Sequence, residues 1–168
     1  MIYTTPDTEE PLSQGDILDD CPVFGLDVSS SDVDLDGAPA RWQERVIVLT
    51  QACDLAQLKT SKVLVALLQP AQMLVERGIL KSPTIRDHVR RGLVYGWYFL
   101  PAAPTVPLVE SIVDLHDLHT VPRAALERLI TDGKRVCRLA PPFREHLAQH
   151  FAVTYMRIGL PAPYDTES

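Results

Sequence analysis

The chain has 168 residues, of which 46% are hydrophobic and 23% are charged, as is typical of a globular domain with a buried apolar core. Its formal net charge of -6 argues against a surface whose main role is to neutralise phosphates, because that role needs a basic patch. We expect a single domain over 1–168, in which 161–168 form a frayed tail.

The cysteines and the N-terminus indicate the compartment. Cys21, Cys53 and Cys137 cannot all pair and form no CxxC unit, which favours reduced thiols over a disulfide framework. The first residues have neither the basic n-region nor the apolar h-region of a signal peptide. No apolar run reaches the roughly 18 residues that span a bilayer. These features predict a cytoplasmic protein of bacterial type that does not associate with membranes.

The first part of the chain is predicted to consist of strands and loops. In chain order we expect strands at 15–18 and 22–28, a polar loop at 29–40, and strands at 45–50 and 62–68. An acidic turn, Asp19 and Asp20, separates the first two strands. The consecutive Val46, Ile47, Val48 and Leu49 predict a central, fully buried strand that pairs with Val63–Leu68. The loop between these two strands contains Cys53 and Asp54.

Helices enter in the second part of the chain. We expect helices at 70–77 and 82–91, strands at 95–100 and 108–115, a helix at 121–130, a strand at 135–139 and a helix at 142–158. Ser82 is expected as the N-cap of the second helix, with Gly92 after its end. In the last helix Leu147 and Phe151 lie on one apolar stripe and are predicted to be core residues.

Short connections between the strands favour an antiparallel arrangement over a doubly wound parallel sheet. The predicted fold class is α+β: a small antiparallel, partly closed SH3-like sheet or barrel with helical insertions and a long C-terminal helix.

The N-terminal strands resemble those of a known family. Gly15, Asp16, Ile17, Leu18 and Pro22, then Arg45–Thr50 and Val63–Leu68, are similar to the start of the PemK/MazF-like toxin fold, an SH3-like barrel. The resemblance ends near Leu68, and the remainder is similar to uncharacterised bacterial proteins. RNA-cleaving members use a basic residue in the loop after the first strand, whereas this chain has Asp19 and Asp20 there. The fold can therefore carry over without the activity.

One candidate for catalysis is Cys53, which follows a buried strand. A cysteine nucleophile needs a nearby histidine and an orienting group. The candidates are His116, His119, His146 and His150 as the base and Asp54 or Asp114 as the orienter. The alternative, which we favour, is a small buried thiol in a turn that Asp54 caps, so that Cys53 is structural.

A second candidate site would bind a metal. His146 and His150 are four residues apart on a predicted helix, and both can face one ion. His116 and His119 form another close pair, and Cys53 or a carboxylate would complete four ligands. Histidines at this spacing are also common at the boundary of an amphipathic helix. We therefore expect no metal and no cofactor.

Aromatic and basic residues alternate in one further segment. Arg90 and Arg91 precede Tyr95, Trp97 and Tyr98, and Arg41 with Trp42 lies elsewhere. Such residues can stack on the bases of single-stranded nucleic acid. The alternation of Tyr95, Trp97 and Phe99 is equally typical of one buried face of a sheet, and we expect core packing.

Three functions remain open at this point. The favoured one is a non-catalytic interaction or accessory module of a bacterial defence or toxin–antitoxin system, with a protein as its partner. RNA is disfavoured as a partner by the acidic charge. The alternatives are a PemK/MazF-like endoribonuclease toxin and a Cys- or metal-dependent hydrolase.

Overall fold

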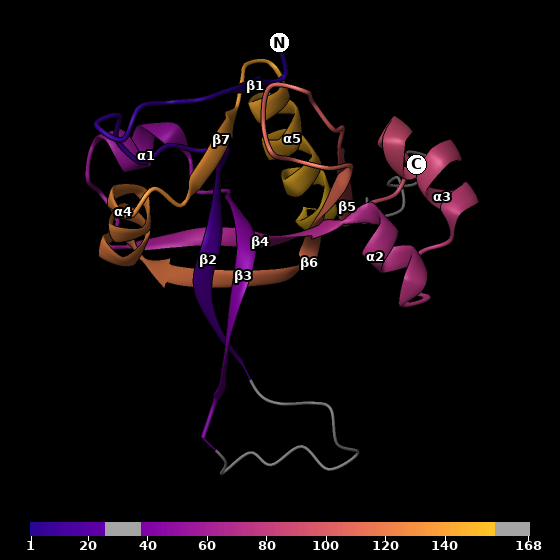
Figure 1. Cartoon of the computed structure of the whole chain (residues 1–168), viewed down its shortest axis with the longest axis horizontal. Helices are drawn as coiled ribbons and strands as arrows, with labels where there is room; N and C mark the ends of the chain where they lie inside the picture. Colours follow the sequence, from indigo (N-terminus) through magenta and orange to yellow (C-terminus); the bar gives the residue numbers. More distant parts are fainter. Residues whose placement is uncertain (26–37, 157–168) are drawn as a thin grey trace, which may run out of the picture.

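A computed structural model describes residues 1–25 and 38–156 and shows an antiparallel sheet with helices around it (Figure 1). Seven strands lie in the order β1-β7-β2-β3-β4-β6-β5. They are β1 (Tyr3–Thr4), β2 (Asp16–Gly25), β3 (Ala40–Val48), β4 (Lys62–Pro70), β5 (Trp97–Leu100), β6 (Ser111–Pro122) and β7 (Arg135–Leu139). The helices are α1 (Ala52–Ala56), α2 (Ala71–Glu76), α3 (Ser82–Asp87), the 3₁₀ turn η1 (Val89–Arg91), α4 (Arg123–Thr131) and α5 (Phe143–Tyr155). The α+β class with an antiparallel sheet is confirmed.

The sheet is open. Its two edge strands, β1 and β5, have only two and four residues and lie at opposite ends of the strand order. Closure requires edge strands that can form a ladder with one another, and in the described part of the chain these do not. The expected partial closure into a sheet or barrel is therefore corrected to an open sheet, although β2 and β3 cross β4 and β6 at a steep angle (Figure 1).

The central strand is the one that the run of apolar residues predicted. Val46, Ile47 and Val48 pair with Leu67, Ala66 and Val65 of β4, and Val46–Leu49 are all buried. This prediction is confirmed. The physical reason is that a run of β-branched residues suits a strand that packs on both faces.

The first long strand differs from the prediction of two strands. β2 runs without interruption from Asp16 to Gly25 and absorbs the acidic pair in a β-bulge, where its register shifts between Leu18 and Cys21. Asp20 has a φ of 57°, and the Asp19 carboxylate binds Arg45 of β3 through two hydrogen bonds. The rest of this expectation, strand residues 26–28 and most of the loop 29–40, lies outside the described residues.

Three further boundaries are corrected. The expected helix 82–91 breaks at His88, and Lys81 rather than Ser82 is its N-cap. The strand expected to end at Leu115 continues as β6 to Pro122, so that His116 and His119 lie in a strand. The C-terminal helix ends at Tyr155, and the last two residues of its predicted span, 157 and 158, lie outside the described residues.

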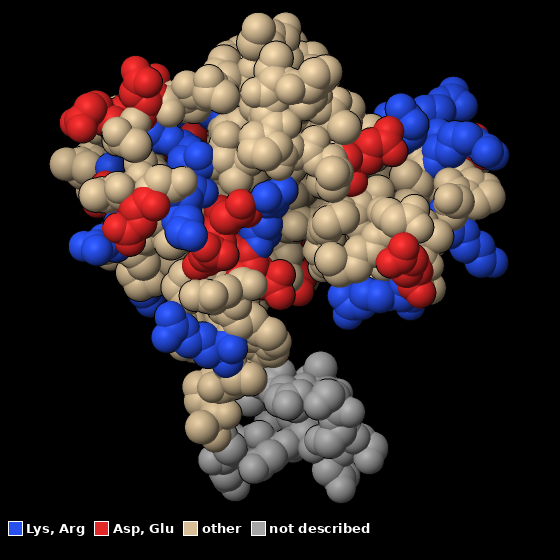
Figure 2. Space-filling view, viewed as in Figure 1, with Lys and Arg blue, Asp and Glu red and all other residues tan. Residues whose placement is uncertain are grey.

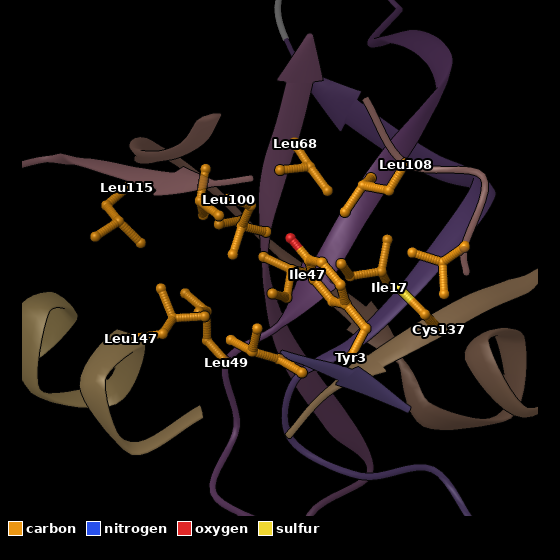
Figure 3. Packing of buried hydrophobic residues seen from close by; sticks show 14 residues of the cluster. Tyr3, Ile17, Ile47, Leu49, Leu68, Leu100, Leu108, Leu115, Cys137 and Leu147 are labelled. Carbon is orange, nitrogen blue, oxygen red and sulfur yellow. The ribbon is translucent and has the colours of Figure 1, made fainter. Parts of the chain in front are cut away.

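Two apolar clusters cover opposite faces of the sheet. One lies beneath α5 and includes Ile47 and Leu147, which is 1% exposed (Figure 3). Phe151, the other predicted core residue, is only half-buried and packs against this cluster. The second cluster includes Val46, Leu126 of α4 and Leu55 of α1.

A buried group of charges joins the start of β2 to β7. Asp16 is fully buried, and its carboxylate accepts hydrogen bonds from Arg138 Nε at 2.6 Å and Arg135 Nη1 at 3.3 Å. Arg135 also donates to the backbone carbonyls of Asp7 and Glu10. The N-terminal segment is thereby bound to a strand near the other end of the described chain.

Candidate functional site

A groove of about 850 Å³ lies between the β2–β3 hairpin and the wall formed by β4 and α2. Figure 2 shows the hairpin projecting from the body of the molecule, with side chains of both charges beside its base. The groove is lined by Val23, Gly25, Trp42, Glu44, Arg45, Leu67, Leu68, Gln69, Pro70, Met73, Arg77, Asp117 and His119. It combines an apolar floor with a few polar groups, the composition that most ligand sites share.

The groove exists because β3 and β4 pair with each other over only a short part of their lengths. β3 pairs with β4 only at Val46–Val48, whereas 40–44 of β3 continue with β2 alone. β4 pairs with β6 along its whole length, from Lys62 to Pro70, so the residues after Leu67 have a neighbour only on the β6 side and then lead into α2. The hairpin and the end of β4 diverge, and the space between them is the groove.

The apolar part of the groove includes two exposed side chains. Val23, Leu67 and Leu68 are buried beneath it, while Trp42 and Met73 are each 39% exposed. A Cβ atom at Gly25 would lie 3.3 Å from the Trp42 ring, so that glycine leaves room for the indole. Exposed tryptophan and methionine are enriched at binding surfaces because both offer large contact areas.

The polar part contains a histidine–aspartate pair. Asp117 Oδ1 lies 2.9 Å from His119 Nε2, and the His119 side chain is 17% exposed. β6 forms an irregularity here, since Leu118 pairs with Ala66 while Asp114 pairs with Leu67. His119 was a candidate catalytic residue, and the structure places it in the groove with a carboxylate partner.

The sequence contains a pattern that indicates this histidine–aspartate pair, although the predicted sites were not based on that pattern. Residues 114–119 are a tandem repeat of Asp-Leu-His. Residues two apart on a strand share a face, so each aspartate can reach its own histidine. Asp114 Oδ1 accordingly lies 3.2 Å from His116 Nδ1.

The two arginines of the groove differ in their partners. Arg45 is held by the Asp19 carboxylate, and this hydrogen bond raises the pKa of its guanidinium. Arg77 is exposed and donates a long hydrogen bond of 3.5 Å to Gln69 Oε1. Within the described part of the chain Arg77 has no carboxylate partner, so its charge is available to a ligand.

Cys53 and Asp54 lie elsewhere, on α1. The Cys53 thiol is exposed rather than buried, and it lies 3.6 Å from Gln51 Oε1 and 3.9 Å from Asp54 Oδ1. Within residues 1–25 and 38–156 no histidine is among its hydrogen-bond partners, and Asp54 does not cap the helix. The expected loop and buried thiol are both corrected, because these residues form a short surface helix.

His146 and His150 share a second hollow, of about 350 Å³, with Tyr95 and Tyr98. The ring of His150 packs edge-on against Tyr98 at a centroid distance of 5.6 Å, and its Nε2 is buried without a hydrogen-bond partner among the described residues. No group of three or more His, Cys, Asp or Glu side chains that could hold a metal ion occurs in the described ranges.

The aromatic segment divides between core and surface. Trp97 and Phe99 pack against a third apolar cluster, with the Arg90 guanidinium 4.8 Å from the centre of the Phe99 ring. Tyr95 is 45% exposed. Trp97 and Phe99 are thus partly buried against the core rather than within it, whereas Trp42 contributes to the groove.

Comparisons with known proteins do not assign this site. No protein-family model matches the chain, and no curated protein matches its sequence. Within 1–25 and 38–156, no helix is long and apolar enough to cross a membrane.

Proposed function

We propose that this chain is a non-catalytic recognition module of a bacterial cytoplasmic system that binds a segment of a partner protein in the groove beside the β2–β3 hairpin. One observation carries the proposal: the groove joins a floor of buried aliphatic side chains to the half-exposed Trp42 and Met73. Binding hot spots have this character, with an aromatic anchor beside a desolvated pocket and polar groups at the rim.

Selection from a displayed library of random peptides on the immobilised full chain tests this function. We expect Trp42→Ala to weaken the selected peptides by about tenfold or more, and Met73→Ala to weaken them as well. Leu93→Ala is the matched control, because Leu93 is 58% exposed and does not line the groove. Selected peptides that bind equally well to Trp42→Ala would contradict the proposal.

A second candidate function, RNA cleavage of PemK/MazF type, is favoured by the Asp117–His119 pair. An imidazole held by a carboxylate can act as a general base. It would take the proton of a ribose 2′-hydroxyl as that oxygen forms a bond to phosphorus and the bond from phosphorus to the 5′-oxygen breaks. The departing 5′-oxygen would take a proton from water, with Arg77 beside the phosphate. We also propose that β2, β3 and β4 have an SH3-like arrangement. The resemblance of the N-terminal residues to this family supports that proposal.

Incubation with single-stranded RNA in the presence of EDTA separates the two functions. The ribonuclease candidate requires cleavage that His119→Gln reduces by at least about a hundredfold and that His88→Gln, a change at an exposed histidine outside the groove, leaves unchanged. Intact RNA after prolonged incubation with the wild-type chain would contradict the ribonuclease candidate and leave the recognition module as the proposed function.

A further inference from the structure

We infer that the partner binds as an extended strand that pairs with the free edge of β3 at 40–45, with alternate apolar side chains in the groove and a basic residue beside Glu44. This inference rests on the proposed recognition function and specifies the conformation and chemistry of its ligand.

The backbone of β3 offers hydrogen-bonding groups along one side. From Ala40 to Glu44 this strand pairs with β2 on its other side, and its ladder with β4 begins only at Val46. Every second residue of a strand directs its N–H and C=O groups to one edge. In the part of the chain that the structure describes, no strand pairs with the groove-side edge of 40–45.

An edge of this kind favours strand addition. Unpaired strand edges bind extended peptides through main-chain hydrogen bonds, while pockets for alternate side chains supply specificity. Native sheets often protect such edges with charged side chains that block pairing. Here Arg41 is held back over the Phe24 ring, 5.9 Å from its centre, and it does not line the groove.

The side chains beside the edge define what a bound strand would present. Trp42 and Glu44 are two residues apart, share a face of β3, and both line the groove. Met73 contributes to the opposite wall, and Leu67 lies buried in the floor. A strand between these walls would direct every second side chain toward apolar surface, so the period-two pattern of its apolar residues is required.

Charge complementarity indicates which charged residue the bound strand should carry. The carboxylate of Glu44 lines the groove on the β3 side, where Arg45 is already paired with Asp19. Asp117 is paired with His119, and Arg77 follows α2 on the opposite wall. A lysine or arginine of the partner would gain a carboxylate from Glu44 and the face of the neighbouring Trp42 ring. We therefore expect a basic residue in the bound strand rather than an acidic one at this position.

A scan of backbone N-methylation tests the strand directly. The probe is a fluorescent octapeptide with alternating apolar residues and one lysine, chosen from a displayed library of that pattern on the full chain. Each amide is methylated in turn, and affinity is measured by fluorescence polarisation. We expect losses of about tenfold or more at alternate positions, since each such N–H donates to β3, and small changes at the positions between them.

Charge is tested on the same probe. Glu44→Gln should weaken the lysine peptide about fivefold but leave its norleucine analogue unchanged, because only the lysine gains from the carboxylate. Glu9→Gln, a change at an exposed carboxylate outside the groove, is the control. Thermal melting verifies that each variant is folded.

The outcomes distinguish failure of strand addition from failure of the recognition function. Octapeptides that depend on Trp42 but tolerate N-methylation everywhere, or lose affinity at successive positions, overturn strand addition while the recognition function stands. Failure of both the random and the patterned libraries to yield any peptide that depends on Trp42 overturns both.

Discussion

Two of the three cysteines lie in the core, and their burial shifts the pKa of their thiols. Cys21 and Cys137 are fully buried. Burial raises the pKa of Cys21 to about 11 and that of Cys137 to about 12, above the value near 8.5 for an unfolded chain. Above that value the unfolded state loses protons that the folded state retains. Both thiols therefore contribute stability that is present below about pH 8.5 and is lost as the pH rises through their folded values.

This residue-level effect gives a prediction for alkaline solution. The free energy of unfolding should fall between pH 8.5 and 11, with a slope of about 1.4 kcal/mol per pH unit for each proton that differs. Cys137→Ala should flatten that slope, and Cys53→Ala, which changes an exposed thiol, is the control. Urea denaturation at several pH values measures this. Equal slopes in Cys137→Ala and wild type would contradict it.

At the scale of single elements, α5 packs on the sheet through Leu147, with Phe143 and Phe151 partly buried beside it. Leu147 is the one residue of this helix that is fully buried, and Phe151 is half-buried against the same cluster. Leu147→Ala should lower the free energy of unfolding by about 2–5 kcal/mol. Phe151→Ala should cost less than the 3–5 kcal/mol typical of a fully buried phenylalanine, a lower value than its place on the apolar stripe suggested.

Chemical denaturation of both variants tests this ordering. Val153→Ala is the control on the same helix, because Val153 is 40% exposed, and its change should be within about 0.5 kcal/mol of zero. A larger loss for Phe151→Ala than for Leu147→Ala would mean that the aromatic residue, and not the leucine, holds the helix.

Sequence patterns predicted elements where local chemistry decided the structure. The run of β-branched residues that ends β3 and its pairing with β4 are of this kind, as are the helix that Pro70 opens and the left-handed Gly92 after η1. The continuity of β2 could not be predicted in this way. It depends on Arg45, which is 26 residues from Asp19 along the sequence and neutralises it across the bulge.

The candidate site shows the same division. His119 was among the predicted candidates, and Trp42 was considered for stacking, but nothing local places them in one groove. The groove depends on where β3 stops pairing with β4, which is a property of the whole sheet. Cys53 was misplaced because α1 has only five residues, too few for helical periodicity to appear in the sequence.

At the scale of the whole molecule, net charge and the local surface have separate consequences. The chain carries a formal charge of -6, yet its groove holds Arg77 and Arg45 beside Glu44 and Asp117. The global charge therefore bears on long-range steering toward partners. The identity of the ligand depends instead on the apolar floor and the few charges at the rim.

The buried cluster around Asp16 also has a consequence for how fast the chain reaches this structure. Asp16 meets Arg135 and Arg138 across 119 and 122 residues of sequence, and β1 and β2 both pair with β7. Contacts between distant residues slow folding, because a large loop must close before they form. We expect refolding on a timescale of milliseconds to seconds rather than microseconds. During synthesis on the ribosome, β1 and the start of β2 cannot pair with β7 until most of the described chain has been made.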